Sequence, residues 1–169
     1  MIKKDKYLLI VLIALSGTVW MACKQQRQIC LTPKIASFTI ESMHRSSVDT
    51  LFSDTALLSA VFIPLTNAST TDSFIYSQAS VFVISLSPVT DTCRWAFATD
   101  TTNNVYDTLT FYYKRNLQFL SNACGYTYFY NLDSVHTTHR NIDSFHITNT
   151  SVTNNANTKH LQIFIHPDF

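Results

Sequence analysis

Only two of the 169 residues are glycines, Gly17 and Gly125. The glycine-rich loops that bind dinucleotides or nucleotide phosphates, and the nucleophile elbow of α/β-hydrolases, need more glycines than this. Glu41 is the only glutamate, so the His-Glu-x-x-His helix of zinc proteases is excluded as well. Charged residues make up 14% of the sequence, and no basic cluster offers the positive surface that nucleic acids need. We therefore expect no nucleic-acid partner.

The first 22 residues have the pattern of an export signal. Lys3, Lys4 and Lys6 give this stretch a positive start, and an apolar run follows at Leu8–Leu15. A run of this length is too short to span the roughly 30 Å of a bilayer's hydrocarbon core, but it is typical of a signal peptide. The sequence thus predicts that residues 1–22 are removed and that the mature chain is exported.

A cysteine follows this segment directly. The small residue Ala22 stands before Cys23, and this arrangement just after an apolar run resembles the lipobox of bacterial lipoproteins. The resemblance implies that Cys23 carries a lipid anchor and that residues 23–28 form a short tether. The alternative is an ordinary secretory signal with Cys23 as a plain thiol.

The remainder of the chain, residues 29–169, predicts one all-β domain. Apolar and polar residues alternate in segments such as Ala36–Glu41 and Thr108–Tyr113, which places successive side chains on opposite faces of a strand. About seven to nine short strands separated by turn residues are typical of a β-sandwich. We expect a single antiparallel β-sandwich of immunoglobulin-like layout.

Three segments carry more detailed expectations. Val81–Leu86 is apolar on both faces, which indicates a central strand that is covered on both sides. Because asparagine tolerates positive φ, Lys114–Asn116 is expected to form a short hairpin loop between two strands. Asp133–Asn141 is interpreted as a loop with room for one helical turn.

The chain has four cysteines, and three remain for disulfide bonds if Cys23 is acylated. Export places the chain in an oxidising compartment, so we expect one bridge and one free thiol. Cys93 lies on an apolar strand face and is interpreted as a buried free thiol. The expected pair is then Cys30 with Cys124, while bridges through Cys93 or Cys23 stay open.

The segment Leu109–Tyr126 is the most informative part of the sequence. The chain combines a lipobox cysteine, a second cysteine, an Ile-Pro-Leu strand, a Tyr-x-Arg-Asn hairpin and a Ser-x-Ala-Cys-Gly-Tyr element, here Cys23, Cys30, Ile63–Leu65, Tyr113–Asn116 and Ser121–Tyr126. This combination resembles an uncharacterised lipoprotein family of Bacteroidota that is known only as a domain of unknown function. The resemblance supports the Cys30–Cys124 pair and implies no catalytic residue.

The resemblance also bears on the location of the protein. Some lipoproteins of that phylum carry an acidic surface-export signal directly after the acylated cysteine. Lys24–Gln28 contains no acidic residue. The resemblance therefore implies an outer-membrane lipoprotein that faces the periplasm.

A tyrosine-rich face is the first candidate for a functional site. Exposed tyrosines bind sugar rings or proteins by stacking and through their hydroxyl groups. The predicted binding face comprises Tyr112, Tyr126, Tyr128 and Tyr130, with Tyr112 pointing outward while Phe111 faces the core. The alternative is that these tyrosines form the rim of the core.

Histidines are the second candidate. His136, His139 and His146 would suit catalytic zinc, which takes three protein ligands, but no cysteine or glutamate supports them. We therefore interpret these three side chains as solvated residues that bind no metal, and we expect the same of His160.

Asp100, Asn103 and Asp107 form an oxygen-rich segment. A calcium loop of the EF-hand type needs a glycine at its sharp turn and a bidentate glutamate. Both are missing here, so we expect a polar hairpin loop.

The function predicted from these observations is that of a non-enzymatic binding or structural module in the cell envelope. Its expected partners are the membrane, through the lipid, and an envelope protein or glycan, with no cofactor. The alternative is a small periplasmic hydrolase, either metal-dependent or with a Ser/His pair.

Overall fold

The computed structural model of the chain describes residues 29–45, 52–54, 56–100 and 105–165. The predicted signal peptide, the expected lipid anchor Cys23 and the tether lie outside these residues. The chain divides into two compact units, Met1–Cys30 and Leu31–Phe169, and every strand among the described residues belongs to the second. The described residues contain no helix, and so none that is long and apolar enough to cross a membrane.

The described residues form eleven strands. Two of them, β2 and β10, are only three and two residues long. These two short strands account for the difference between the eleven strands observed and the seven to nine expected. In chain order the strands are β1 (Phe38–Arg45), β2 (Phe52–Asp54), β3 (Leu57–Pro64), β4 (Phe74–Ala79), β5 (Val81–Ile84), β6 (Thr92–Ala98), β7 (Asp107–Ser121), β8 (Gly125–His136), β9 (Ile142–Ile147), β10 (Ser151–Val152) and β11 (Leu161–Ile165).

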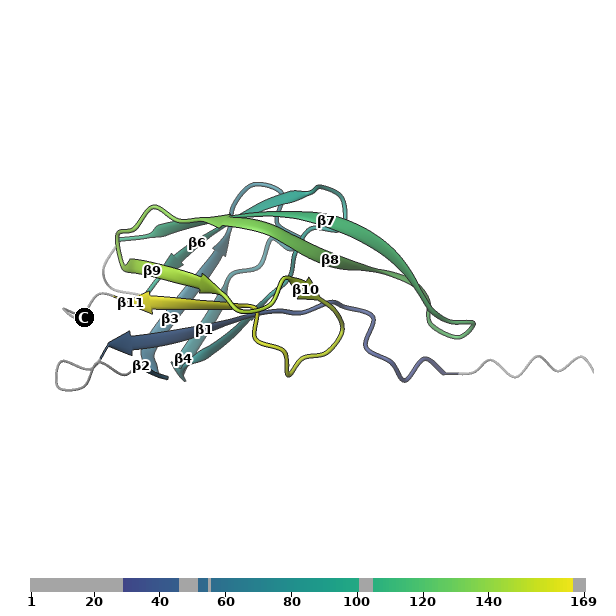
Figure 1. Cartoon of the computed structure of the whole chain (residues 1–169), viewed down its shortest axis with the longest axis horizontal. Helices are drawn as coiled ribbons and strands as arrows, with labels where there is room; N and C mark the ends of the chain where they lie inside the picture. Colours follow the sequence, from purple (N-terminus) through teal and green to yellow (C-terminus); the bar gives the residue numbers. More distant parts are fainter. Residues whose placement is uncertain (1–28, 46–51, 55, 101–104, 166–169) are drawn as a thin grey trace, which may run out of the picture. The chain divides into compact units, whose positions relative to one another are not determined.

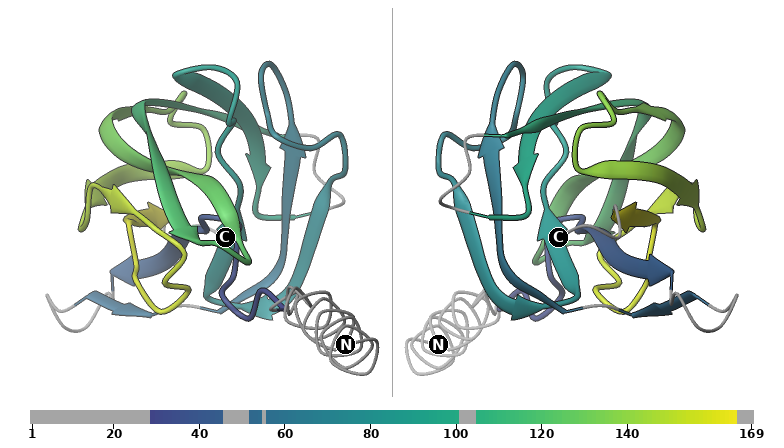
Figure 2. Two further views of the ribbon diagram at one scale, coloured as in Figure 1. Left: turned by 90° about the vertical axis from the view of Figure 1, so that its right-hand side faces the viewer. Right: turned by 90° about the vertical axis from the view of Figure 1, so that its left-hand side faces the viewer.

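The strands are arranged in two packed sheets (Figure 1). The first sheet has the order β2-β1-β11-β9, with β5 also paired to β1, and the second has the order β10-β8-β7-β6-β3-β4. Every pairing is antiparallel except that of β1 with β11. The two views of Figure 2 show the sheets facing each other across the core. The predicted β-sandwich is confirmed.

The core between the sheets is rich in aromatic rings. The ring of Phe62 in β3 lies 4.9 Å from that of Phe97 in β6 and 5.4 Å from that of Phe82 in β5, between centroids. Phe38 of β1 meets Phe111 of β7 edge-on at 5.0 Å, so rings from both sheets interlock. All five side chains are fully buried, and burying one such side chain contributes about 1.5–3 kcal/mol to folding.

The segment that was expected to be a central strand lies at a sheet edge instead. Among the described strands β5 pairs with β1 alone, and both Val81 and Val83 are exposed. Tyr76 of β4 accounts for the difference. Its hydroxyl donates to the Val83 carbonyl at 2.6 Å and accepts from the Val83 N–H at 3.2 Å. The tyrosine thereby satisfies backbone groups that a neighbouring strand would otherwise bind.

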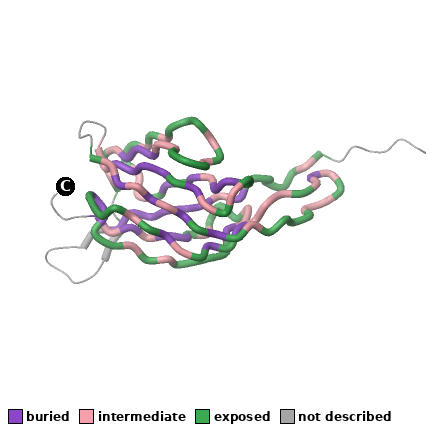
Figure 3. Tube along the Cα trace, turned by 90° about the horizontal axis from the view of Figure 1, so that it is seen from above, coloured by how far each residue is buried: buried purple, intermediate pink, exposed green. Residues whose placement is uncertain are grey.

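β7 and β8 form a long hairpin that extends beyond the rest of the sandwich (Figure 1, Figure 3). The expectation of a hairpin loop at Lys114–Asn116 was wrong, because these residues lie inside β7 and pair with β8. The chain turns after Ser121, whose hydroxyl accepts a hydrogen bond from the Cys124 N–H at 3.0 Å. Gly125 closes the turn with a φ of 73°, a left-handed conformation that glycine adopts without steric cost.

Asp107, the first residue of β7, organises the segment that follows β8. Its carboxylate is fully buried and accepts a hydrogen bond from the Thr138 hydroxyl at 2.8 Å. It also accepts hydrogen bonds from the backbone N–H groups of Arg140 at 2.6 Å, Asn141 at 2.6 Å and Ile142 at 3.0 Å. The expected polar hairpin loop therefore does not include Asp107, which is a buried strand residue.

This network also replaces the helical turn that was considered for Asp133–Asn141. β8 continues as a strand to His136, and the residues after it have no helical assignment. His139 has a φ of 54°, which is incompatible with a right-handed helix. The segment is a loop whose backbone N–H groups donate to a carboxylate rather than to the backbone carbonyl groups of a helical turn.

Candidate binding groove under the β7–β8 hairpin

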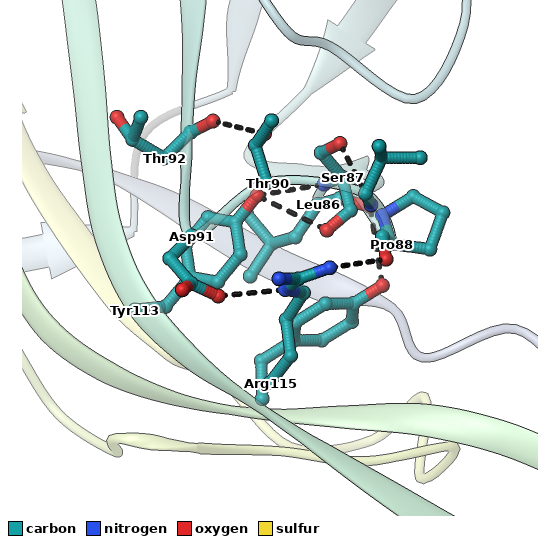
Figure 4. A network of polar contacts seen from close by, with 10 residues as sticks. Leu86, Ser87, Pro88, Thr90, Asp91, Thr92, Tyr113 and Arg115 are labelled. Atoms are coloured by element: carbon teal, nitrogen blue, oxygen red, sulfur yellow. Dashed lines mark hydrogen bonds and ion pairs between the residues drawn. The ribbon is translucent and has the colours of Figure 1, made fainter.

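A hydrogen-bonded clamp joins the β7–β8 hairpin to the loop between β5 and β6 (Figure 4). The Tyr113 hydroxyl accepts a hydrogen bond from the Ser87 N–H at 2.9 Å and donates one to the Ser87 carbonyl at 3.3 Å. Burial raises the pKa of the Tyr113 hydroxyl far above its ordinary value, so this group keeps its proton and remains a donor.

Arg115 forms the second half of the clamp. Its Nε donates to the Asp91 carboxylate at 2.6 Å and its Nη1 donates to the Pro88 carbonyl at 2.8 Å. The hydrogen bond to Asp91 raises the pKa of the guanidinium further. The guanidinium carbon also lies 5.9 Å from the ring centroid of Tyr128, within the range of a cation–π contact. The clamp thereby connects the loop to the tyrosines of β8.

The register of the hairpin divides the four predicted binding tyrosines into two groups. Residues directly opposite each other in an antiparallel pair share a face, and Tyr126 and Tyr128 lie opposite Phe119 and Leu117. With Tyr130 they continue the face that forms the core. Tyr112 lies on the other face. Three of the four tyrosines that were predicted to form one face therefore share a face of the hairpin, and Tyr112 does not.

The three tyrosines of β8 become more exposed toward the hairpin tip. Tyr130 is 7% exposed, Tyr128 is half-buried and Tyr126 is 66% exposed. Tyr130 packs edge-on against Tyr113 at 5.2 Å between ring centroids, which makes it a core residue. Tyr112 is exposed while Phe111 is buried, as predicted, and its ring meets His136 edge-on at 5.6 Å.

A groove of about 480 Å³ lies beside these tyrosines. This volume is within the range of small-molecule sites, which is about 300–1,000 Å³. Four stretches of chain contribute to its walls: the segment before β1, the loop between β3 and β4 with the start of β4, the loop after β5, and β8. The lining residues are Lys34, Ile35, Ala36, Ser69, Thr70, Phe74, Ser85, Leu86, Pro88, Tyr126, Thr127, Tyr128 and Tyr130.

Polar groups fix the walls of the groove to one another. The Ser69 hydroxyl donates to the Ser85 carbonyl at 3.2 Å, and the Thr127 hydroxyl donates to the Lys34 carbonyl. The Tyr130 hydroxyl donates to the Leu86 carbonyl at 3.3 Å, and burial raises the pKa of this hydroxyl to about 12. The groove is thus bounded by rigid strands and by loops that are tied to them.

The three histidines considered for zinc do not form a metal site. His136 lies in β8 and His146 lies in β9 of the other sheet. His139 Nδ1 lies 3.2 Å from the Ile142 carbonyl and 2.9 Å from the Asp143 carbonyl. In the part of the chain that the structure describes, no three histidine, cysteine, aspartate or glutamate side chains are grouped to hold a metal ion.

The expectation that His160 is solvated was wrong, because this side chain is fully buried. Its Nδ1 accepts a hydrogen bond from the Thr39 N–H at 3.1 Å, and its Nε2 lies 3.2 Å from the Ser151 carbonyl. The ring stacks on Phe38 with centroids 5.2 Å apart. Burial lowers the pKa of His160, although the bond to Ser151 acts in the opposite direction. The neutral imidazole joins three parts of the fold.

Glu41 is a second buried polar residue, and its partners Lys159 and Gln162 flank His160 in the sequence. It alternates with the core residue Ile40 in β1, yet it is almost fully buried. Its carboxylate forms an ion pair with Lys159 and accepts a hydrogen bond from Gln162 Nε2 at 3.1 Å. Burial by itself raises the pKa of Glu41, but these two partners outweigh it, so the pKa lies below its ordinary value.

The cysteine predictions agree with the structure. Cys30 is disulfide-bonded to Cys124, and Cys93 is a fully buried free thiol. Burial raises the pKa of the Cys93 thiol, which disfavours the reactive thiolate. Cys124 belongs to the turn of the β7–β8 hairpin, so the bridge attaches the tip of this hairpin to the start of the domain.

Several residues of the groove were not identified from the sequence. Ser69 and Thr70 line it from the loop before β4 and Phe74 from the start of β4, more than 30 residues before the hairpin begins, and no local pattern marks them. The Tyr-x-Arg-Asn element was visible in the sequence, and the structure assigns it a role. Its Tyr113 and Arg115 hold the loop that forms one wall of the groove.

Comparisons with known proteins give a family and no function. No curated protein and no solved structure matches the chain. The profile of the family of unknown function DUF6452 matches residues 78–165, just over half of the chain, a region that includes the clamp and the β7–β8 hairpin. The chain belongs to this family.

Proposed function

We propose that this chain is a non-enzymatic binding module of the bacterial cell envelope, held at the periplasmic side of the outer membrane by a lipid on Cys23. We further propose that it binds a sugar chain in the groove under the hairpin. The observation that carries the proposal is the position of Tyr126 and Tyr128, whose side chains line the groove from one face of β8.

The chemistry of the groove favours a sugar over a strongly charged ligand. Tyr126, Tyr128 and Phe74 supply aromatic surface, which packs against the apolar faces of sugar rings while hydroxyl groups form hydrogen bonds. Ser69 and Thr70 add hydroxyl groups to the same groove, and Lys34 is the one charged residue among its lining residues. Few charges and several rings match an extended neutral ligand.

The surroundings of the groove favour binding without a large rearrangement. The clamp of Tyr113 and Arg115 holds the loop after β5 in place, and Phe74 stacks on the buried Trp95 at 5.7 Å between ring centroids. A site that is already ordered loses less conformational entropy when it binds. The groove is therefore suited to bind its ligand without a large loss of conformational entropy.

The matched pair Tyr128→Ala and Tyr112→Ala tests this proposal. Both tyrosines belong to the hairpin strands, but only Tyr128 lines the groove. The probes are two neutral glycans, a hexamer of N-acetylglucosamine and a hexamer of glucose, titrated calorimetrically into the mature protein. Loss of one stacked ring is expected to weaken binding by about tenfold, which corresponds to about 1.4 kcal/mol.

Tyr112→Ala is expected to bind the same glycan as tightly as the unchanged protein. Thermal unfolding of both variants shows whether the fold is retained. If the unchanged protein binds neither glycan, or if both variants lose affinity equally, the sugar-binding groove is refuted.

A further inference from the structure

The tip of the β7–β8 hairpin is apolar, exposed and without charge. Leu117 is 57% exposed and Phe119 is 53% exposed, and the two lie on the same face of the hairpin as Tyr128 and Tyr126, with which they pair across the strands. The Phe119 and Tyr126 rings are in contact, with centroids 5.2 Å apart. No charged residue occurs between Asn116 and Leu132, although this part of the hairpin extends away from the sandwich (Figure 3).

The segment that precedes β1 has the same character. Leu31 is 91% exposed and Ile35 is 67% exposed. In Figure 1 this segment leaves the sandwich at the end toward which the hairpin extends. The bond from the Thr127 hydroxyl to the Lys34 carbonyl holds the segment beside β8. Apolar side chains from two separate parts of the chain are thus exposed at one end of the domain.

Covalent bonds restrict how far this end of the domain can lie from the membrane. The turn residue Cys124 is bonded to Cys30, and Cys30 is seven residues after Cys23 in the sequence. Seven residues span at most about 25 Å when fully extended. A lipid on Cys23 therefore keeps the hairpin tip within reach of the bilayer surface.

We propose that the hairpin tip docks on the bilayer that holds the anchor, with Leu117 and Phe119 entering the membrane interface. This inference rests on the lipid at Cys23, which belongs to the proposed function. Aromatic side chains are favoured at the interface between lipid and water. In the sequence, Lys24 and Arg27 stand between Cys23 and Cys30, and Lys34 follows Cys30; positive charges beside a membrane anchor attract anionic headgroups.

The anchor makes a small apolar tip sufficient for docking. A second contact between the same two partners takes place at the high effective concentration that the first contact creates. The tip does not need to bind a membrane by itself. Docking fixes the orientation of the domain on the bilayer, and with it the direction in which the groove opens relative to the membrane surface.

A fluorescence experiment with the acylated protein tests this proposal. The variant Phe119→Trp places a reporter at the tip, and Leu58→Trp places one at an 83% exposed site in β3, which β6 separates from β7. Trp95 is buried and contributes the same background to both. Each protein is purified from cell envelopes and reconstituted into vesicles of phosphatidylethanolamine and phosphatidylglycerol with brominated acyl chains.

We expect the emission of Trp at position 119 to shift to shorter wavelength and to be quenched by the brominated chains, and the emission at position 58 to show neither effect. Flotation of the vesicles tests the anchor in the same samples. Protein that floats while both reporters stay unquenched, or are quenched equally, overturns docking and leaves the anchor standing. Protein that does not float overturns the anchor, and docking with it.

Discussion

The carboxylate of Asp107 is predicted to be one of the most important polar groups for the stability of this fold. Two of its backbone donors, the N–H groups of Asn141 and Ile142, belong to buried residues. In Asp107→Ala both donors lose their acceptor. A buried donor without a partner costs about 1–3 kcal/mol, so the two together predict a loss of about 4 kcal/mol in the free energy of unfolding.

Asp107→Asn tests the same reasoning with almost no change in volume. An amide keeps one acceptor oxygen but replaces the other with an N–H₂ group, which faces donors on whichever side it lies. If the amide oxygen stays with Asn141 and Ile142, the amide nitrogen meets the Arg140 N–H, which then loses its acceptor. We expect a loss of about 2 kcal/mol, since one donor is left unsatisfied and the remaining bonds lose their charge.

Urea unfolding at neutral pH, followed through the fluorescence of the buried Trp95, measures both variants. Asp133→Asn in β8 is the matched control, because this aspartate is exposed, and it should change the free energy of unfolding by less than about 0.5 kcal/mol. The reasoning is refuted if Asp107→Asn is as stable as Asp133→Asn, or if Asp107→Ala is no less stable than Asp107→Asn.

Three further predictions concern the disulfide and the two buried titratable groups. Cys124→Ser opens a loop of more than 90 residues and should lower the free energy of unfolding by about 4 kcal/mol, whereas Cys93→Ala should lower it by about 1–2 kcal/mol. Equal urea midpoints of the two variants would contradict the assignment of Cys124 to the disulfide and of Cys93 as the free thiol. Because the pKa of Glu41 is lowered in the fold, its stabilisation exists above the unfolded pKa and is lost as the pH falls through the folded pKa. Glu41→Gln should therefore be less stable than the unchanged protein at pH 7, and this difference should shrink as the pH falls through the folded pKa of Glu41; a difference that stays constant with pH would refute the ion pair's contribution. Because the pKa of His160 is also lowered, the unfolded state takes up its proton first, and stability should fall as the pH drops below about 6.5; His160→Gln should lose this part of the pH dependence, and an unchanged profile would exclude His160 as its source.

The fold followed from the sequence where local alternation decides the structure. Phe111 faces the core and Tyr112 faces solvent, because successive side chains of a strand point to opposite faces whatever the neighbouring strands are. The buried free thiol of Cys93 was predictable for the same reason. Each of these features is a property of one strand, so the alternation of residues within that strand is enough to predict it.

The errors arose where distant residues decide the structure. Asn116 and Gly125 are both suited to a turn, and the chain turns at Gly125 while Asn116 stays in β7, where it pairs with Phe129 of β8. His160 occupies a position that alternation assigns to solvent. It is buried because Thr39, 121 residues away in the chain, donates to its ring. Neither the position of the turn nor the burial of His160 can be predicted from the neighbouring residues in the sequence alone.

The candidate site was predicted in part for the same reasons. The three tyrosines of β8 were recognisable as a stripe, and all three share a face. Tyr112 was grouped with them because the position of the turn, and the irregularity in the β7–β8 register after Tyr112, were not known. The remaining walls of the groove come from loops whose positions depend on the packing of both sheets.

The intact mass of the protein from native membranes, measured without reduction and after alkylation under denaturing conditions, tests the central claim most directly. Our account predicts a mass that begins at Cys23 and includes acyl chains, with one alkylated thiol, that of Cys93. A chain without lipid would contradict the anchored binding module and the docking of its hairpin tip. A chain without a reactive thiol would contradict the single bridge between Cys30 and Cys124.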